Sequence, residues 1–269
     1  MIHALLVASM PLLLASLGAL VSDFSGYLAV FLEGALALGS FLVWVFSVWS
    51  NSLSIGFLIT MILTGFIGWL LSRFIRWTSA NPFVSALALN LGVVGIIETV
   101  SVLLYHTKGV LRDPRFPRVD MYFFVWISFL IMILAYAVIY HTPIGLRLRA
   151  SGRRPEVLLQ RGIDPVRYRD GAWVVAAMLA ALAGGIITVK VGAYTPGGTT
   201  GEGWIALVMV YLGFRRVWGV ALAAIIFTFI ERLGIEAQGM FSIPSTILLG
   251  LPSLLALLLY IISQLLRKE

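Results

Sequence analysis

Three polar residues stand inside long apolar runs and are the first candidates for chemistry in this sequence. Glu33 lies in LAVFLEGALALG and Glu98 in GIIETVS, and Asn90 precedes Glu98 by two helical turns on nearly the same face. A charged side chain at the centre of a membrane-spanning helix costs about 2.5–3.5 kcal/mol on insertion scales, so such groups often line a solute path. Hydrogen bonds between helices near a membrane boundary are the other interpretation. Glu33, Asn90 and Glu98 are therefore candidate pathway residues, with both interpretations open.

A glycine-rich segment at residues 192–203 supplies a second group of candidate pathway residues. It contains five glycines, and Tyr194, Thr199 and Glu202 are among its polar side chains. The segment leads directly into a short apolar stretch that begins at Trp204, so the free backbone amides of a helix start should point at its opening. A flexible loop without a role in solute binding explains the glycines equally well.

The segment 142–170 combines seven arginines with the signature of a short helix. Leu158, Leu159 and Gly162 follow Pro155 at i+3, i+4 and i+7, on one helix face, and Gly162 suits a helix C-terminus. A solvated positive loop explains the arginines but not a capped helix with an apolar face, whereas a docking element for a cytoplasmic partner explains both. From the residues alone the two interpretations have equal weight. The candidate docking residues are Arg153, Pro155, Glu156, Leu158, Leu159 and Gly162.

Several kinds of chemistry lack their residues in this chain. There is no cysteine, and the three histidines are scattered, so thiolate metal sites, redox chemistry and a His-Glu-x-x-His zinc site are excluded. The phosphate-binding pattern G-x-x-x-x-G-K-S/T is missing as well. We expect no catalytic residue, no metal and no cofactor in this subunit. A membrane-embedded enzyme that uses Glu33 or Glu98 as acid or base remains the alternative.

The elements that position these residues must be membrane-spanning helices. The chain of 269 residues is 60% hydrophobic and 12% charged, whereas soluble domains are about 45–50% apolar and about 25% charged. Because a helix needs about 20 apolar residues to cross the hydrocarbon layer, we predict an all-α bundle that forms one transmembrane domain over residues 1–269. It has about seven full spans and a hairpin of short helices, with seven to nine crossings in all. The predicted full spans are 1–22, two within 34–72, 77–97, 121–140, 171–189 and 237–266, and the short helices are 204–214 and 217–230.

Short residue patterns predict the positions of two connections between helices and of one face for helix packing. Ser50-Asn51-Ser52 is a polar turn inside the long run, and Asn81-Pro82 is typical of an N-cap and first helical residue. Ala177, Ala181 and Gly185 recur at every fourth position. Small residues at this spacing let helices approach closely in lipid.

The basic residues divide unevenly between the two ends of the predicted spans. Thirteen of the nineteen fall on the side of segment 142–170 if the spans alternate in direction. Cytoplasmic loops carry the excess of lysine and arginine in membrane proteins. We therefore expect the N-terminus outside, the C-terminus in the cytoplasm, and 142–170 as a cytoplasmic loop. The net charge of +7 then reflects membrane orientation and not a nucleic-acid partner.

Five segments resemble, in order and spacing, one family of membrane proteins. They read PLLLASLGALVSDFSGYLAVFLEGALALGSF, NPFVSALALNLGVVGI, TPIGLRLRASGRRPEVLLQRGIDPVRYR, an Ala/Gly-rich span ending in LAGGI, and GGTTGEGWIALVMVYLG. The family consists of permease subunits of binding-protein-dependent ABC importers for branched-chain amino acids, simple sugars and nucleosides. The resemblance covers nearly the whole chain. Its NPF-x-x-x-LALN element is most similar to nucleoside-type members, some of whose relatives import riboflavin.

The resemblance implies a multi-pass subunit of the bacterial cytoplasmic (inner) membrane, surrounded by lipid. Its implied partners are an ABC ATPase that holds ATP and Mg²⁺, a second permease subunit in a heterodimer of homologues, and an extracytoplasmic substrate-binding lipoprotein. The implied coupling loop is 142–170, and the implied solute is a nucleoside first, then riboflavin or a simple sugar. A standalone carrier is a further alternative. Such a carrier often shows two similar halves, and no convincing repeat is visible in the chain.

Overall fold

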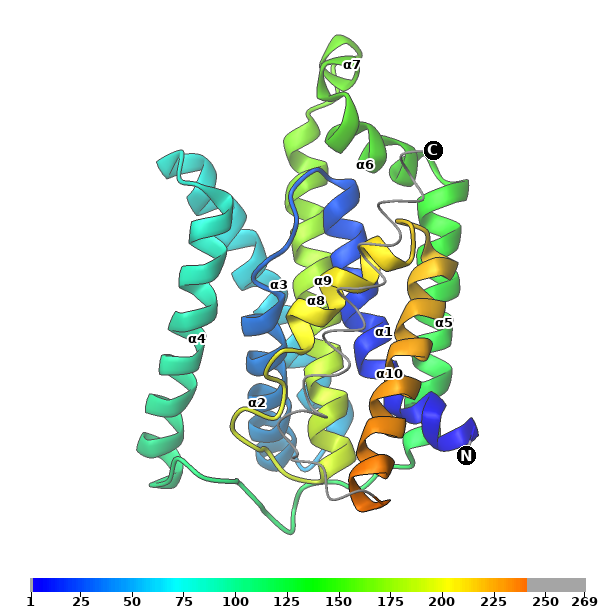
Figure 1. The fold of residues 1–269 in the computed structure, drawn as a ribbon. Helices are drawn as coiled ribbons and strands as arrows, with labels where there is room; N and C mark the ends of the chain where they lie inside the picture. Colours follow the sequence, from blue (N-terminus) through cyan, green and yellow to red (C-terminus); the bar gives the residue numbers. More distant parts are fainter. Residues whose placement is uncertain (1, 241–269) are drawn as a thin grey trace.

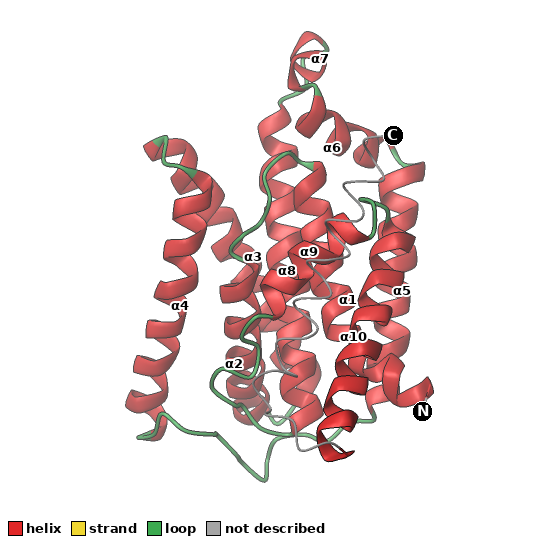
Figure 2. Ribbon diagram, in the orientation of Figure 1, coloured by secondary structure: helices red, strands yellow, loops and turns green. Residues whose placement is uncertain are grey.

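The computed structural model describes residues 2–240, which form a bundle of ten helices (Figure 1). Within these residues the only β-structure is one isolated bridge, between Leu111 and Tyr194 (Figure 2). The predicted all-α fold is confirmed. The helices are α1 Ile2–Phe24, α2 Leu32–Ser50, α3 Leu53–Thr78, α4 Pro82–Tyr105, α5 Met121–His141, α6 Pro143–Arg153, α7 Pro155–Gln160, α8 Pro165–Val191, α9 Glu202–Leu212 and α10 Val217–Met240.

Seven of the described helices are long and apolar enough to cross a membrane: α1, α2, α3, α4, α5, α8 and α10. The spans α1, α2, α3, α4, α5 and α8 run in alternating directions along the bundle, whereas α10 runs in the same direction as α8 because the short helix α9 lies between them (Figure 1). Helices α6 and α7 lie together at one end. We call this the α7 end. The predicted turn between the two helices of the long apolar run is confirmed, since α2 ends at Ser50 and α3 begins at Leu53.

The start of α4 follows the predicted capping chemistry. The Asn81 side-chain oxygen accepts hydrogen bonds from the amides of Phe83 at 2.9 Å and Val84 at 3.4 Å, and Pro82 is the first helical residue. Proline suits this position because its missing N–H would have no partner there. The predicted span began too early, however, because Trp77 belongs to the last turn of α3.

The prediction of a hairpin made of two short helices is half right. Helix α9 has 11 residues, but α10 has 24 and continues through Glu231 and Arg232, beyond the predicted end at residue 230. A charged pair near a membrane boundary does not stop a helix, because its backbone hydrogen bonds continue and long side chains reach water. The predicted span 237–266 begins inside α10, and its remainder from residue 241 lies outside the described residues.

Helix α8 is the centre of the bundle. It packs against α1, α2 and α3, and 78% of the residues in its most apolar 18-residue stretch are buried. Its small residues permit this contact, because a methyl group on Gly185 would lie 2.5 Å from the Phe57 ring of α3 and 2.6 Å from the Val43 side chain of α2. The predicted close packing at this small-residue face is confirmed. In contrast, only 22% of the residues in the corresponding stretch of α4 are buried, and α4 lies at the edge of the bundle.

Candidate solute pathway and coupling surface

Glu33 holds the start of α9 against the start of α2. Its two carboxylate oxygens accept hydrogen bonds from the backbone amides of Gly201 at 2.6 Å and Gly203 at 2.9 Å. These amides belong to the α9 N-terminus, where free N–H groups and the helix dipole favour a negative charge. A side chain at Gly203 would lie 2.5 Å from the Glu33 amide nitrogen, so glycine is required by the close approach. The sequence left both a solute path and a structural hydrogen bond open for Glu33, and the structure gives its carboxylate backbone partners.

Asn90 is also committed to backbone groups. Its side-chain oxygen accepts from the Gly34 amide at 2.8 Å, and its side-chain nitrogen donates to the Val30 carbonyl at 2.9 Å. The side chain is 8% exposed and connects α4 to the segment before α2. Glu33 and Asn90 therefore meet at the same helix start, and both make the structural hydrogen bonds that the sequence left open as the alternative.

The other predicted pathway residues separate in the structure. Glu98 is exposed and pairs with Lys108 at 3.4 Å. Tyr194 and Thr199 are buried in the glycine-rich loop, and Tyr194 exchanges backbone hydrogen bonds with Leu111. Burial, with the negative charge of Glu98 as a second cause, raises the pKa of Tyr194 to about 12, so its hydroxyl stays protonated at physiological pH. The loop is thus anchored rather than freely flexible.

Glu202 lines a cavity of about 800 Å³ at the end of the bundle opposite α7. The cavity lies between α1, α5, α8 and α10, and Lys190, Glu231 and Arg232 also line it. None of these four charged side chains makes an ion pair with another described residue. The cavity therefore offers free hydrogen-bond donors and acceptors of both signs. Of the predicted pathway residues, Glu202 is the one that faces it.

At the α7 end, the short helix predicted after Pro155 forms and ends at the expected glycine. The Ile163 amide donates to the Leu158 carbonyl and the Gly162 amide to the Leu159 carbonyl, each at 2.9 Å. This pair of bonds is a Schellman ending, and Gly162 has the positive φ of +69° that it requires. Helix α6, which precedes it and carries Arg153, was missed. Its N-cap Thr142, followed by Pro143, was the available signal.

The two leucines of α7 lie in different environments. Leu158 is 4% exposed and packs within the chain, whereas Leu159 is 60% exposed. Val157 is also exposed, at 41%, but it is two positions from Leu159 and therefore lies on a different side of the helix. Successive helical residues are about 100° apart, so the shared face expected from the spacing is divided between the chain's interior and its surface.

Helix α6 is held against the bundle by backbone contacts. A Cβ on Gly152 would collide with the Phe24 carbonyl at the end of α1 and with the Gly26 amide in the connection between α1 and α2. The Ser151 carbonyl accepts from the Arg169 guanidinium of α8 at 3.0 Å, and that guanidinium lies 4.8 Å from the centre of the Tyr27 ring. The α7 end therefore joins α6, α8 and the α1–α2 connection into one contact network.

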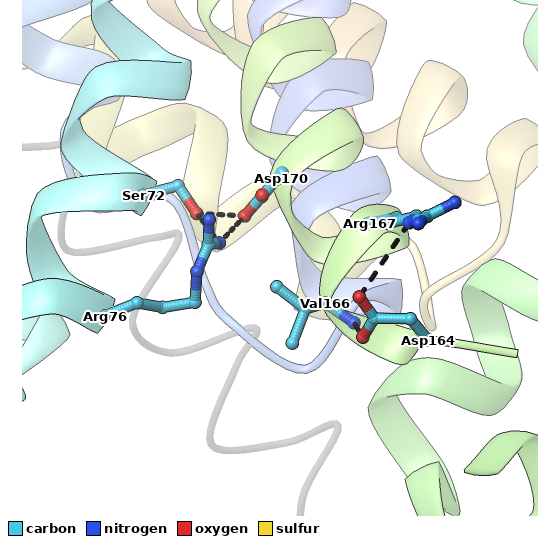
Figure 3. A network of polar contacts seen from close by, with 6 residues as sticks. All are labelled: Ser72, Arg76, Asp164, Val166, Arg167 and Asp170. Carbon is cyan, nitrogen blue, oxygen red and sulfur yellow. Dashed lines mark hydrogen bonds and ion pairs between the residues drawn. The ribbon is translucent and has the colours of Figure 1, made fainter.

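Two ion pairs at this end were not predicted. Asp23 of α1 accepts from the Arg215 guanidinium at 2.6 Å, and the Asp23 side chain is 8% exposed. Arg76 of α3 pairs with Asp170 of α8, which also accepts a hydrogen bond from Ser72 at 2.6 Å (Figure 3). The pairs fasten the α9–α10 turn and α3 to the central helices.

The fold and these sites define a class of protein, a multi-pass helical membrane protein. Comparison with known families identifies it further. The family model described as the permease component of branched-chain amino acid transport systems matches residues 1–262. The chain belongs to this family of ABC transporter permeases, so its membrane location and its role as a permease component follow. Permease subunits of this family are not themselves enzymes, and their importers include an ATPase and a binding protein.

The relatives of this chain are named for different solutes. The chain is 24% identical to the guanosine ABC transporter permease protein NupQ of Bacillus subtilis, over 87% of this chain and 81% of the relative. It is 25% identical to the nucleoside ABC transporter permease protein NupC of Lactococcus lactis, over 91% and 86%. A putative glucose ABC transporter permease protein, TsgC13 of Haloferax volcanii, is 23% identical over 89% and 78%. No solved structure matches the chain.

Proposed function

We propose that this chain is a permease subunit of an ABC importer for nucleosides, working with a homologous second permease, a partner ATPase that holds ATP and Mg²⁺, and an extracytoplasmic substrate-binding lipoprotein. The observation that carries the proposal is the family match over residues 1–262, together with two relatives named for guanosine and nucleosides. A simple sugar is the second candidate solute, because one relative is named for glucose. Riboflavin rests on the motif resemblance alone.

The α7 end faces the cytoplasm in this proposal. The arginines of segment 142–170 lie in and around α6 and α7, and Arg76 and Arg215 make their ion pairs at the same end. The excess of basic residues marks the cytoplasmic side of bacterial inner-membrane proteins. The cavity lined by Glu202 then opens toward the outside, where a binding protein delivers its solute.

The chemistry of that cavity suits a neutral ring compound with hydroxyl and amino groups. Its volume of about 800 Å³ falls in the range of ligand pockets, about 300–1,000 Å³. Carboxylates of Glu202 and Glu231 accept hydrogen bonds from sugar hydroxyls and base amino groups, while Lys190 and Arg232 donate to carbonyl and ring nitrogens. A nucleoside carries all of these groups, and it brings no net charge into a site where both signs are already present.

In this proposal the ATPase is coupled through α7, and Leu159 alone, instead of Leu158 and Leu159 together, is the side chain that docks. Leu159 enters a groove of the partner, while Leu158 holds α7 to its own chain. Arg153 and Glu156 lie at the rim, where charges contribute less than buried anchors. Pro155 and Gly162 set the start and end of the helix. ATP binding can shift the permease between access states only if the partner contacts α7 differently in each state.

The docking proposal is tested with two adjacent substitutions. Leu159→Asp buries a charge against the partner's groove, which costs several kcal/mol, so the permease should reach the membrane but lose its ATPase on purification and stop transporting. Gln160→Asp adds the same charge at the next exposed position and serves as the control. Equal ATPase retention by the two variants would refute docking through Leu159.

The solute proposal is tested in proteoliposomes that contain both permeases and the ATPase, with the binding protein supplied. We expect ATP-dependent uptake of guanosine, and weaker or no uptake of riboflavin, glucose and leucine. Glu202→Gln should raise the guanosine concentration for half-maximal uptake, whereas Glu98→Gln, outside the cavity, should not. Uptake of leucine alone would overturn the nucleoside assignment.

A further inference from the structure

A groove between α3 and α4 has no assigned role. It has a volume of about 650 Å³ and lies toward the α7 end of the two helices, beside the turn that joins them. Its walls are mainly apolar and include Ile67, Leu70, Phe74 and Leu89. Because α4 is packed only along its contacts with α2 and α3, much of its surface near the groove is exposed.

The charged residues of the groove are both arginines. Arg73 and Arg76 line it, and no acidic residue does. Arg76 is engaged by Asp170, whereas Arg73 is exposed and has no hydrogen-bond or ion-pair partner among residues 2–240. An unpaired guanidinium beside an apolar groove is a donor for an anionic oxygen, and phosphate geometry suits its fork of N–H groups.

The position of Trp77 fixes the depth of the groove in the membrane. Trp77 lines the groove with its side chain 84% exposed, one helical turn beyond Arg73. Tryptophan with arginine at the end of a span is typical of the level of lipid headgroups. The apolar walls then extend from that level into the hydrocarbon layer, and the guanidinium lies at the level of the phosphates.

We propose that this groove binds an anionic phospholipid of the inner leaflet. The phosphate contacts Arg73, the headgroup lies beside Trp77, and one acyl chain lies between α3 and α4 against Leu70 and Leu89. Charge favours this occupant over a zwitterionic lipid, because the positive charge of Arg73 is not balanced by a carboxylate of the described residues. The lipid supplies the packing that α4 lacks within its own chain. This inference does not depend on which solute is transported.

The test compares two lipids on the purified full-length permease by native mass spectrometry. Palmitoyl-oleoyl-phosphatidylglycerol and the phosphatidylcholine with the same chains are titrated onto the detergent-solubilised protein. Wild type should bind phosphatidylglycerol about fivefold more tightly, the preference that one basic residue near a lipid surface supplies. Arg73→Gln should remove most of this preference, whereas Arg154→Gln, an exposed arginine on the same end away from the groove, should retain it.

A second variant tests the acyl-chain part of the site. Leu89→Trp fills the groove and should weaken binding of both lipids while the preference between them persists. Unchanged preference in Arg73→Gln would overturn the proposal. So would photocrosslinking to the second permease subunit, in the assembled importer, of Phe74→Cys labelled with benzophenone maleimide in this cysteine-free chain, because it would show that a second subunit covers the groove.

Discussion

Replacing Glu33 by alanine should release the start of α9 from α2. The carboxylate accepts amide hydrogen bonds at 2.6 and 2.9 Å, from Gly201 and Gly203. Each hydrogen bond to a charged group contributes about 1.5–3 kcal/mol, so two give an upper range of about 3–6 kcal/mol. Glu33 is partly exposed, and water that replaces the carboxylate recovers part of this loss. We expect Glu33→Ala to lower the free energy of unfolding by about 2–4 kcal/mol, and Glu33→Gln, which keeps one acceptor, by about half as much.

The measurement is equilibrium unfolding of the purified protein in mixed micelles with increasing dodecyl sulfate, together with amide hydrogen exchange at Gly201 and Gly203. Glu98→Ala is the control, because its pair with Lys108 has side chains 54% and 69% exposed and should contribute about 0–1 kcal/mol. Exchange at the two glycines should accelerate in Glu33→Ala only. If the two alanine variants unfold within about 0.5 kcal/mol of each other and exchange is unchanged, the carboxylate does not hold α9.

Further predictions concern the α7 end and orientation. Arg215→Gln should lower the free energy of unfolding by about 2–4 kcal/mol, because the Asp23 carboxylate is left buried without its partner. Adding Asp23→Asn should restore most of this free energy, and equal unfolding midpoints of the single and double variants would contradict the prediction. Gly152→Ala should lower stability by about 1–3 kcal/mol because its methyl group meets a backbone carbonyl at the end of α1, measured by the same unfolding. In intact cells, an impermeant maleimide should label Arg115→Cys but not Glu156→Cys, and the reverse result would invert the proposed topology.

The parts of the fold that sequence predicted well depend on neighbouring residues. A run of about 20 apolar residues specifies a span through its own composition, which is why α5 and α8 lie close to where they were expected. Asn81 and Gly162 act within their own helix ends, so their roles could be inferred from spacing. The end of α10 was misplaced because charge was treated as a stop signal, although charged residues are compatible with continuous helical hydrogen bonding.

The site residues were harder to interpret because their partners are distant in sequence. Glu33 binds amides 168 and 170 residues away, and Asp23 binds a guanidinium 192 residues away. No periodicity links such positions, and a single sequence contains no signal for their pairing. The cost of a polar group in an apolar span correctly indicated that Glu33 and Asn90 need partners. It could not distinguish a bound solute from a backbone amide.

The contacts around α7 explain why one of its two leucines is buried and the other is exposed. Spacing put Leu158 and Leu159 on one face, but only the side of α7 that carries Leu158 packs on the rest of the chain, so Leu158 is buried and Leu159 is exposed. From α6 the contacts continue through Gly152 to the connection between α1 and α2, and that connection leads into Glu33, which holds the start of α9. If a partner docks on α7 as proposed, a displacement of α7 meets a series of packed groups that reaches the start of α9, and packed interiors transmit such displacements because they are nearly incompressible.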